Sequence, residues 1–202
     1  MKISAIIFDL GKVLVDFDFT RSAMELTQNS GSSVEDVFLF VRNSSLIAEY
    51  SKGRMTSENF FKELKEAFDY DGTVEELQQL WCDIFTPMDA HIQLAKHLAQ
   101  YYPLAILSNT DEAHIQFLES RHDFFDIFQE KIYSFQVGYL KPAQEIYQIA
   151  LERMKTDRFE TLFIDDVEEN IIPPSKMGWQ TIHLRPDVSL KHALQSYDLR
   201  GV

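Results

Sequence analysis

Three carboxylates stand directly after short apolar runs of the sequence. Asp9 follows residues 6–8 (IIF), and Asp165 and Asp166 follow residues 161–164 (TLFI). Such runs are typical of strands buried on both faces of a parallel sheet, where ligands bind beyond the carboxyl ends of the strands. Adjacent buried carboxylates repel one another unless a cation lies among them, and two or three hard oxygen ligands suit Mg²⁺. The spacing therefore predicts a magnesium site at the edge of a sheet.

A hydroxyl and a lysine are expected at the same edge. Ser108 and Asn109 end a third apolar run, and Lys141 lies in the connection that precedes residues 161–164. Taken singly, Ser108 and Asn109 could cap a helix, Lys141 could be a solvated surface cation, and the acids could be turn or capping residues. Taken together, three acids, a hydroxyl and a lysine at one edge favour a functional site.

The elements that must position these residues alternate between strands and helices. Short β-branched or apolar runs predict strands, and helical patterns separate them. This alternation indicates βαβ units, and hence an α/β fold in which helices cover both faces of a parallel sheet. The predicted strands are residues 2–10, 104–108, 131–135, 161–164 and 180–184, and the predicted helices are residues 89–100, 111–120, 143–154 and 189–197.

Residues 17–88 interrupt the alternation, because their patterns are those of helices alone. Ser33 stands where a helix would begin, and Thr73 opens a capping box with Glu76. A block of helices between the first and second strands suggests a cap over one end of the sheet. The predicted helices of this block are residues 19–28, 33–41, 57–68 and 74–85.

The expected domain organisation is a core with one insertion. Residues 1–16 and 89–202 would form the α/β core domain, and residues 17–88 would form the helical cap. The total length of 202 residues fits this arrangement, since it is large for one domain and small for two full ones. Hinges are expected at residues 16–18 and 86–88.

Composition narrows the class of protein. The chain is 45% hydrophobic and 25% charged, which is ordinary for a globular protein with a sizeable core. No apolar run reaches the roughly 18 residues that cross a bilayer, and the start of the chain lacks the cleavage site of a signal peptide. The single cysteine, Cys82, excludes an intrachain disulfide and fits a reducing cytosol.

The strong negative charge limits the partners. A net charge of −13 disfavours nucleic acid, because phosphate backbones attract basic surfaces. An anionic small substrate would also be repelled at long range, so binding one would require a local cation. We therefore expect a cytoplasmic protein that acts on a small molecule, with neither nucleic acid nor membrane as its partner.

Four segments of the sequence, which contain Asp9, Ser108, Lys141 and Asp165 in chain order, resemble the motifs of the haloacid dehalogenase superfamily. Its members are mostly phosphatases. The motifs read FDLGKVLV, LSNT, the lysine of GYLKPAQEIY, and FIDDVEEN. The phrase KGRMTSENF resembles members with a helical cap, and the likeness covers essentially the whole chain. It is nearest to small sugar-phosphate phosphatases of the glucose-1-phosphate phosphatase type, whose first motif has the form DLGN.

The resemblance implies a nucleophile and a metal site. Asp9 would attack phosphorus and form an aspartyl-phosphate. Mg²⁺ would be held by Asp9, by the main-chain carbonyl of Gly11, and by Asp165 or Asp166, with the choice between these two left open. The cation would neutralise the nucleophile and the incoming phosphate together.

The resemblance also implies roles for the other residues at this edge. Ser108 and the backbone amide of Asn109 would bind a phosphoryl oxygen, and Lys141 would balance the charge of the nucleophile and the transferring group. Asn170 would orient the metal side. The implied activity is Mg²⁺-dependent hydrolysis of a small phosphorylated metabolite, with a sugar phosphate as the expected substrate. The alternatives are an inactive phosphate-binding or regulatory protein and a metal-independent 2-haloacid dehalogenase.

Gly11 departs from the superfamily pattern. Most members have a second aspartate there, which protonates the leaving oxygen and later activates water. Positioned acid–base catalysis is worth roughly 10²–10⁴-fold, so its loss must be compensated. The substrate could have an easier leaving group, such as an anomeric sugar oxygen, or Asp16 or Asp18 could supply the acid. The third possibility is a protein that binds phosphate without hydrolysing it. The DLGN likeness favours the first.

Two further positions differ from the pattern. Lys12 replaces a glycine of many relatives, and it could reach the phosphate or point to solvent. Proline has no amide donor and is tolerated in the first turn of a helix, so we expect the helix after Asp166 to begin at Pro173 and Pro174. A turn would then precede it and could shift Asn170.

Substrate selection is expected from the cap, with Phe17, Arg21, Arg42, Tyr50 and Arg54 as candidates.

Overall fold

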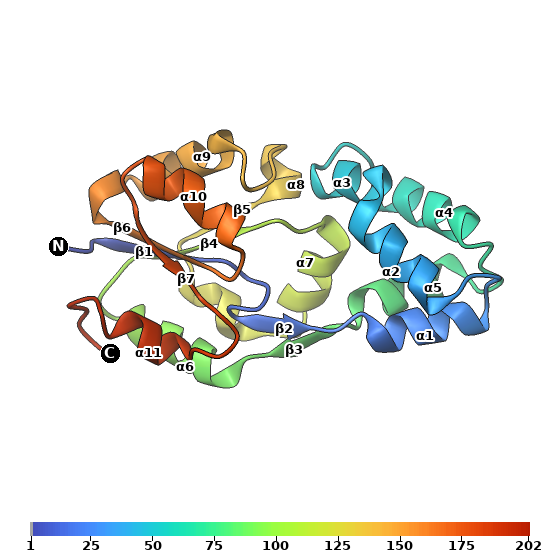
Figure 1. The fold of residues 1–202 in the computed structure, drawn as a ribbon, viewed down its shortest axis with the longest axis horizontal. Coiled ribbons are helices and arrows are strands. Elements are labelled where there is room, and N and C mark those ends of the chain that lie inside the picture. Colours follow the sequence, from blue (N-terminus) through green and yellow to red (C-terminus); the bar gives the residue numbers. More distant parts are fainter. Residues whose placement is uncertain (1) are drawn as a thin grey trace.

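The core of the molecule is a parallel sheet of five strands, namely β1 (Ala5–Phe8), β4 (Leu104–Ser108), β5 (Glu130–Tyr133), β6 (Thr161–Asp165) and β7 (Gln180–His183). A computed structural model describes residues 2–202 (Figure 1). The strand order is β5-β4-β1-β6-β7, and every neighbouring pair is parallel. All five predicted strands are therefore confirmed, and the segments that follow β1, β4 and β6 meet at one edge.

Helices cover both faces of this sheet, as predicted. They are α6 (Asp89–Leu98), α7 (Glu112–Glu119), α8 (Ser134–Val137), α9 (Gln144–Met154), α10 (Glu168–Lys176) and α11 (Leu190–Leu194), with 3₁₀ turns at Asp123–Ile127 and Arg158–Glu160. Within residues 2–202, no helix has both the length and the apolar character needed to cross a bilayer.

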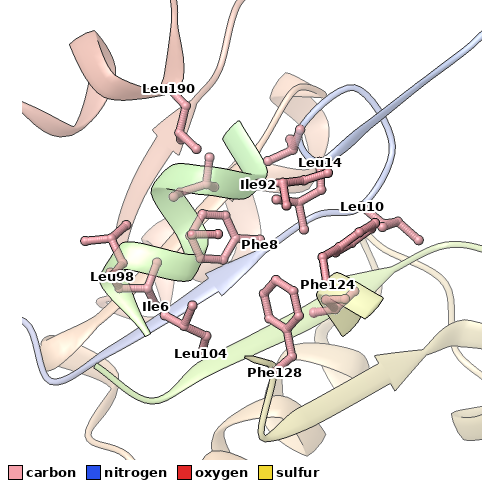
Figure 2. Packing of buried hydrophobic residues seen from close by; sticks show 14 of the residues in the cluster. Ile6, Phe8, Leu10, Leu14, Ile92, Leu98, Leu104, Phe124, Phe128 and Leu190 are labelled. Atoms are coloured by element: carbon pink, nitrogen blue, oxygen red, sulfur yellow. The ribbon is translucent and has the colours of Figure 1, made fainter. Parts of the chain in front are cut away.

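The side chains of β1 alternate between the two faces, as the period of a strand requires. Ile6 and Phe8 belong to a hydrophobic cluster with α6 and α11 (Figure 2). Ile7 points to the opposite face and packs in a second cluster with Tyr147 of α9 and Trp179. The run IIF is thus buried on both sides, which fixes the strand and the position of the carboxylate that follows it.

Residues 17–88, called the helical block below, form a separate group of helices at one end of the molecule (Figure 1). Ser33 and Thr73 both cap helices through capping boxes, which confirms the predicted start signals. The block has its own hydrophobic cluster, which includes Phe60, Phe61 and Trp81. Its helices are α1 (Thr20–Gln28), α2 (Val34–Asn43), α3 (Ser45–Ser51), α4 (Ser57–Ala67) and α5 (Val74–Cys82).

The helical block is not helical throughout, contrary to the prediction. Where hinges were expected, β2 (Val15–Phe17) and β3 (Phe85–Pro87) pair as an antiparallel ribbon that joins the block to the sheet domain. The predicted helix over residues 74–85 ends at Cys82 for this reason. The short helix α3 was missed by the sequence pattern. Two paired strands are a more defined connection than two free hinges.

Helix α10 begins at Glu168 and contains both Pro173 and Pro174, so the predicted start of this helix at the prolines was wrong. A proline at position 174 removes the amide that would donate to the carbonyl oxygen of Asn170, one helical turn earlier. The hydroxyl of Tyr147 donates to that carbonyl instead, at 2.8 Å. A side chain from the neighbouring helix α9 thus satisfies the acceptor, and the helix continues through the prolines.

The helical block is joined to the start of α7 by buried hydrogen bonds. The hydroxyl of Tyr50 accepts the backbone amide of Ala113 at 3.2 Å. The indole Nε1 of Trp81 donates to Oδ2 of Asp111 at 3.1 Å, and Nε2 of His114 donates to the carbonyl oxygen of Trp81 at 2.9 Å. This junction places α3 and α5 over the carboxyl edge of β4.

Candidate active site

The three predicted carboxylates meet at the carboxyl edge of the sheet. Asp9 follows β1 directly, Asp165 is the last residue of β6, and Asp166 is the next residue. One oxygen from each of the three lies within 4.8 Å of the others. Asp165 is fully buried and Asp9 is 8% exposed. The adjacent parallel strands β1 and β6 therefore produce the acidic cluster that the sequence predicted.

Lys141 lies between two of these acids. Its Nζ is 2.8 Å from Oδ1 of Asp9 and 2.6 Å from Oδ2 of Asp165, and its side chain is buried. The reading of this lysine as a solvated surface cation is therefore excluded. One buried cation bridges two buried carboxylates, an arrangement that is stable only with close geometry and further hydrogen bonds.

Asn109 holds the Lys141 segment in place. Its side-chain Nδ2 donates to the carbonyl oxygen of Lys141 at 2.9 Å, and its Oδ1 accepts the amide of the same residue at 2.7 Å. Beside it, Ser134 accepts the amide of Thr110 and donates to the carbonyl of that residue, both at 2.9 Å. The sequence suggested a backbone role for Asn109, and this double side-chain contact was missed because the two partners are far apart in the chain.

Asp165 and Asp166 have different surroundings. Besides its contact with Lys141, the carboxylate of Asp165 accepts a hydrogen bond from the backbone amide of Val167 at 2.8 Å. Its two oxygens also accept Nδ2 of Asn170, at 3.1 and 3.2 Å. Asp166 is partly exposed, and its carbonyl oxygen is 2.9 Å from Nε2 of His183. Asn170 therefore stays beside the acidic cluster despite the prolines that follow it.

Burial and mutual repulsion control the protonation of these acids. Burial raises the pKa of Asp9 to about 7; the charge of Lys141 opposes this rise, and the charge of Asp165 adds to it. Burial and the charge of Asp165 also raise the pKa of Asp166. Burial alone would lower the pKa of Lys141, but Asp9 and Asp165 raise it. Lys141 pairs with two of the three carboxylates, so a divalent cation fits the oxygen atoms and the excess negative charge.

Phe17 occupies the space beside Gly11. A Cβ atom on Gly11 would lie 3.0 Å from Cε1 of the Phe17 ring. Lys12 has a left-handed backbone (φ 55°), and its Nζ donates to the carboxylate of Asp16 and, at 2.8 Å, to the carbonyl oxygen of Phe17. Lys12 thus neither reaches the acidic cluster nor extends freely into solvent, and it holds the aromatic ring over the glycine.

Asp16 and Asp18 are poorly suited to replace the missing acid. Both are exposed. The hydrogen bond from Lys12 lowers the pKa of Asp16, and hydrogen bonds from Thr20 at the start of α1 lower the pKa of Asp18. A carboxylate with a lowered pKa is a weak proton donor near neutral pH.

A cavity of about 220 Å³ lies between this edge of the sheet and the helical block. Its floor includes Gly11, Ser108 and Asn109, and Ser108 itself is buried. Of the five block residues expected to select the substrate, Phe17 lines this cavity, whereas the others lie elsewhere. Arg21 pairs with Glu25, Arg54 pairs with Glu49, Tyr50 is buried at the α7 junction, and Arg42 is exposed.

Comparisons with known proteins identify the relatives of this chain. A family model described as haloacid dehalogenase-like hydrolase matches residues 3–178. A D-ribitol-5-phosphate phosphatase from Bacteroides thetaiotaomicron is 26% identical over 89% of this chain and 90% of that protein. The sesquiterpene phosphatase astK from Aspergillus oryzae is 25% identical over 89% of each chain.

The fold has solved counterparts. A haloacid dehalogenase family enzyme from B. thetaiotaomicron, solved in complex with magnesium and inorganic phosphate, superimposes with a TM-score of 0.83. The two chains are 24% identical, and the match covers 94% of this chain and 98% of that one. The likeness to the glucose-1-phosphate phosphatase type stays a prediction, since none of these comparisons tests it.

Proposed function

Because the chain belongs to the haloacid dehalogenase-like hydrolase family, we propose that it is a Mg²⁺-dependent phosphatase with Asp9 as its nucleophile. The observation that carries this proposal is the cluster of three carboxylates at the carboxyl edge of the sheet, in which the buried Asp9 and Asp165 are paired with Lys141. A metal-independent dehalogenase would use Asp9 but would have no need of the acids that follow β6. The phosphatase names of two relatives and the magnesium and phosphate bound by a structural neighbour support the same activity.

In this proposal Asp9 attacks the phosphorus atom of a phosphate monoester. A bond forms between a carboxylate oxygen and phosphorus, the bond from phosphorus to the ester oxygen breaks, and that oxygen leaves as an anion that takes a proton from water to give the alcohol. Water then attacks the aspartyl-phosphate, which releases inorganic phosphate and restores Asp9. Lys141, at 2.8 Å from Asp9, would balance the negative charge of the nucleophile and of the transferring group.

The proposed ligands of the cation are Asp9, the carbonyl oxygen of Gly11 and Asp166. We favour Asp166 over Asp165 because both oxygens of Asp165 are engaged with Lys141, Val167 or Asn170. When bound, Mg²⁺ would neutralise charge so that the carboxylate and the phosphate can approach each other. Asp165 would then position Lys141 and Asn170, which is consistent with its complete burial.

Ser108 and the backbone amide of Asn109 are the proposed contacts of a phosphoryl oxygen, since both lie at the end of β4 and line the cavity. We further propose that residues 17–88 act as a cap on a core formed by residues 1–16 and 89–202. The antiparallel β2–β3 ribbon would then be the connection about which the cap moves.

The substrate is a small phosphorylated metabolite in this proposal. Two relatives support different kinds of alcohol in this substrate. The sequence suggested a sugar phosphate, and the similarity to a D-ribitol-5-phosphate phosphatase supports a polyol or sugar phosphate. The similarity to a sesquiterpene phosphatase, at nearly the same identity, supports an apolar alcohol instead.

A hydrolysis screen tests the proposed activity. Phosphate release would be measured over sugar, polyol, aryl and terpenoid phosphates, with Mg²⁺ present and after removal of the metal with a chelator. We expect turnover that requires Mg²⁺. Activity on 2-haloacids that persists with the chelator would favour the dehalogenase, and Mg²⁺ binding without turnover of any phosphate would favour a binding protein.

A further inference from the structure

The wall of the cavity that belongs to the helical block is apolar. It is formed in part by the side chains of Phe17, Phe19, Val41, Ile47, Trp81 and Phe85. Within the part of the chain that the structure describes, Ser51 is the one polar side chain that the block contributes to this wall. A leaving group held here would therefore contact aromatic and aliphatic carbon on the side away from the phosphate.

The ionisable side chains that α7 contributes to the cavity already have partners. Oδ2 of Asp111 accepts Nε1 of Trp81 at 3.1 Å and lies 3.0 Å from Nδ1 of His114. Nε2 of His114 donates to the carbonyl oxygen of Trp81, and the two rings stack in parallel at 5.3 Å. These groups bind one another across the junction between the helical block and α7, so they are not free to bind substrate hydroxyls.

A polyhydroxylated substrate would fit this environment poorly. Each hydroxyl that leaves water without finding a partner is penalised, whereas burial of apolar surface is favourable. The volume agrees with a compact apolar group, because a cavity of about 150 Å³ lined by apolar side chains can hold benzene. At about 220 Å³, the present cavity can hold one ring or a short branched chain.

The missing acid provides a second, independent argument. The Phe17 ring fills the space into which a side chain at position 11 would project. Without a positioned acid, the ester oxygen must leave as an anion, and this is easiest for an alcohol of low pKa. A phenol has a pKa of about 10, far below that of water at about 15.7 and of comparable alkyl alcohols.

From these two observations we propose that the preferred substrate is a phosphate monoester of a small apolar alcohol, with an aryl phosphate as the class that fits best. This inference rests on the phosphatase activity proposed above and differs from the sugar phosphate that the sequence suggested. The apolar wall would select the alcohol of the substrate. The low pKa of that alcohol would compensate for the proton that Gly11 cannot supply.

Two pairs of substrates test the inference in the native protein with Mg²⁺. Glucose 6-phosphate and cyclohexylmethyl phosphate both release a primary alcohol attached to a six-membered ring, and they differ in the ring hydroxyls. We expect kcat/KM to favour the apolar member by on the order of 10²-fold. Phenyl phosphate should in turn exceed cyclohexyl phosphate by a similar factor, because its leaving group is more acidic.

The outcomes separate the inference from the proposed activity. Equal rates within the first pair, or a preference for glucose 6-phosphate, would overturn the apolar substrate class and leave the phosphatase intact. Equal rates on phenyl and cyclohexyl phosphate would overturn the preference for aryl esters. Absence of turnover on all four compounds, with turnover of another phosphate in the screen, would overturn the inference alone, and absence of turnover on every phosphate of the screen would overturn both.

A matched set of variants locates the selectivity in the cavity. Ile47→Asn adds an amide to the wall and should narrow the preference for cyclohexylmethyl phosphate over glucose 6-phosphate about tenfold, since new hydrogen bonds become available to hydroxyls. Ile47→Ala keeps the wall apolar and should retain the preference. Leu39→Asn changes an exposed leucine of the same block, outside the cavity, and should leave it unchanged. An unaltered ratio in a folded Ile47→Asn variant would show that the leaving group binds elsewhere.

Discussion

The carboxyl edge of the sheet and the helical block, which lie on either side of the cavity, carry opposite kinds of side chain. At the sheet edge, Asp9, Lys141 and Asp165 are charged, buried and joined by contacts of 2.6 to 2.8 Å, and they lie behind the cavity floor that Gly11, Ser108 and Asn109 form. On the helical-block side, Ile47 and Trp81 present carbon to the same space. The difference teaches that the chemistry and the choice of leaving group are separable in this molecule. Substitutions in the acidic cluster and in the apolar wall should therefore have different effects.

The largest effect is expected from Asp9→Asn. An amide cannot attack phosphorus, so kcat should fall by on the order of 10⁴–10⁶-fold. The fold should survive, because the substitution removes one of three mutually repelling acids. Steady-state phosphate release and thermal unfolding measure the two effects, and the exposed Asp16→Asn is the matched control. Near-native turnover by Asp9→Asn would show that the nucleophile is another residue.

Lys141→Met should have the next largest effect. It leaves Asp9 and Asp165 buried without their shared cation, and loss of one partner of a buried ion pair costs about 3–5 kcal/mol. We also expect kcat to fall by roughly 10²–10³-fold, because the charge that opposes the transferring phosphate is lost.

The matched control for this variant is Lys131→Met, which breaks a more exposed ion pair with Glu119. Its free energy of unfolding should change by about 1 kcal/mol or less. Denaturant unfolding of both variants measures the difference. Similar losses in the two would show that the ion pairs of Lys141 contribute no more than those of a surface lysine.

A smaller effect is expected at the boundary between the two sides. Gly11→Asp would supply the missing acid, and the backbone of Gly11 lies outside the left-handed region, so an L-residue is acceptable there. The added Cβ would still meet Phe17 at 3.0 Å. We therefore expect Gly11→Asp with Phe17→Ala to raise kcat/KM on alkyl phosphates by roughly 10²-fold relative to Phe17→Ala alone.

Gly11→Asp by itself should gain less than the double variant. Rates on a series of phosphates with leaving groups of increasing pKa measure the result, since an acid flattens that dependence. If the slope of the series stays the same in the double variant, then the absence of a carboxylate at position 11 is not what limits alkyl phosphates.

The smallest predicted effect is a dependence of stability on pH and metal. The pKa of Asp9 rises from about 4 in the unfolded chain to about 7 in the folded one, so its contribution to folding weakens as the pH rises from 4 through 7. Without metal, this part of the unfolding free energy should therefore decrease toward pH 8. Mg²⁺ should raise the Tm most at high pH, because it binds the ionised carboxylates.

Differential scanning calorimetry at pH 5 and pH 8, with Mg²⁺ and with a chelator, measures this prediction. Asp9→Asn should lose most of the pH dependence in the absence of metal. A Mg²⁺-induced shift of the Tm that is as large in Asp9→Asn as in the native protein would argue against Asp9 as a ligand.

The sheet side was predictable from the sequence because its signals are local. An apolar run such as residues 6–8 predicts a buried strand, and the residue that follows this strand must lie at the edge of the sheet. The positions of Asp9, Asp165 and Asp166 could therefore be predicted, whereas Lys141 follows no strand and its burial between Asp9 and Asp165 has no local signal. The partners of Asn109 could not be predicted, because no local pattern shows that its amide meets the backbone of Lys141.

The helical-block side was predicted less well because it depends on packing between elements. Arg21 and Arg54 were candidates for substrate binding by their charge, yet both form ion pairs elsewhere. Ile47 and Trp81 line the cavity, and in the sequence they resemble any other apolar helix residues. Helix α10 shows the same limit, since only the three-dimensional contact with Tyr147 explains how it passes through two prolines.

The junction between Trp81 and the start of α7 has a kinetic consequence. The indole and carbonyl of Trp81 bind Asp111 and His114, and the same ring lines the cavity. The helical block can move away from α7 only when these hydrogen bonds separate, so they oppose any motion that would widen the cavity. Trp81→Phe keeps an aromatic ring and removes the indole donor, so the block would separate from α7 more readily without any change near phosphorus.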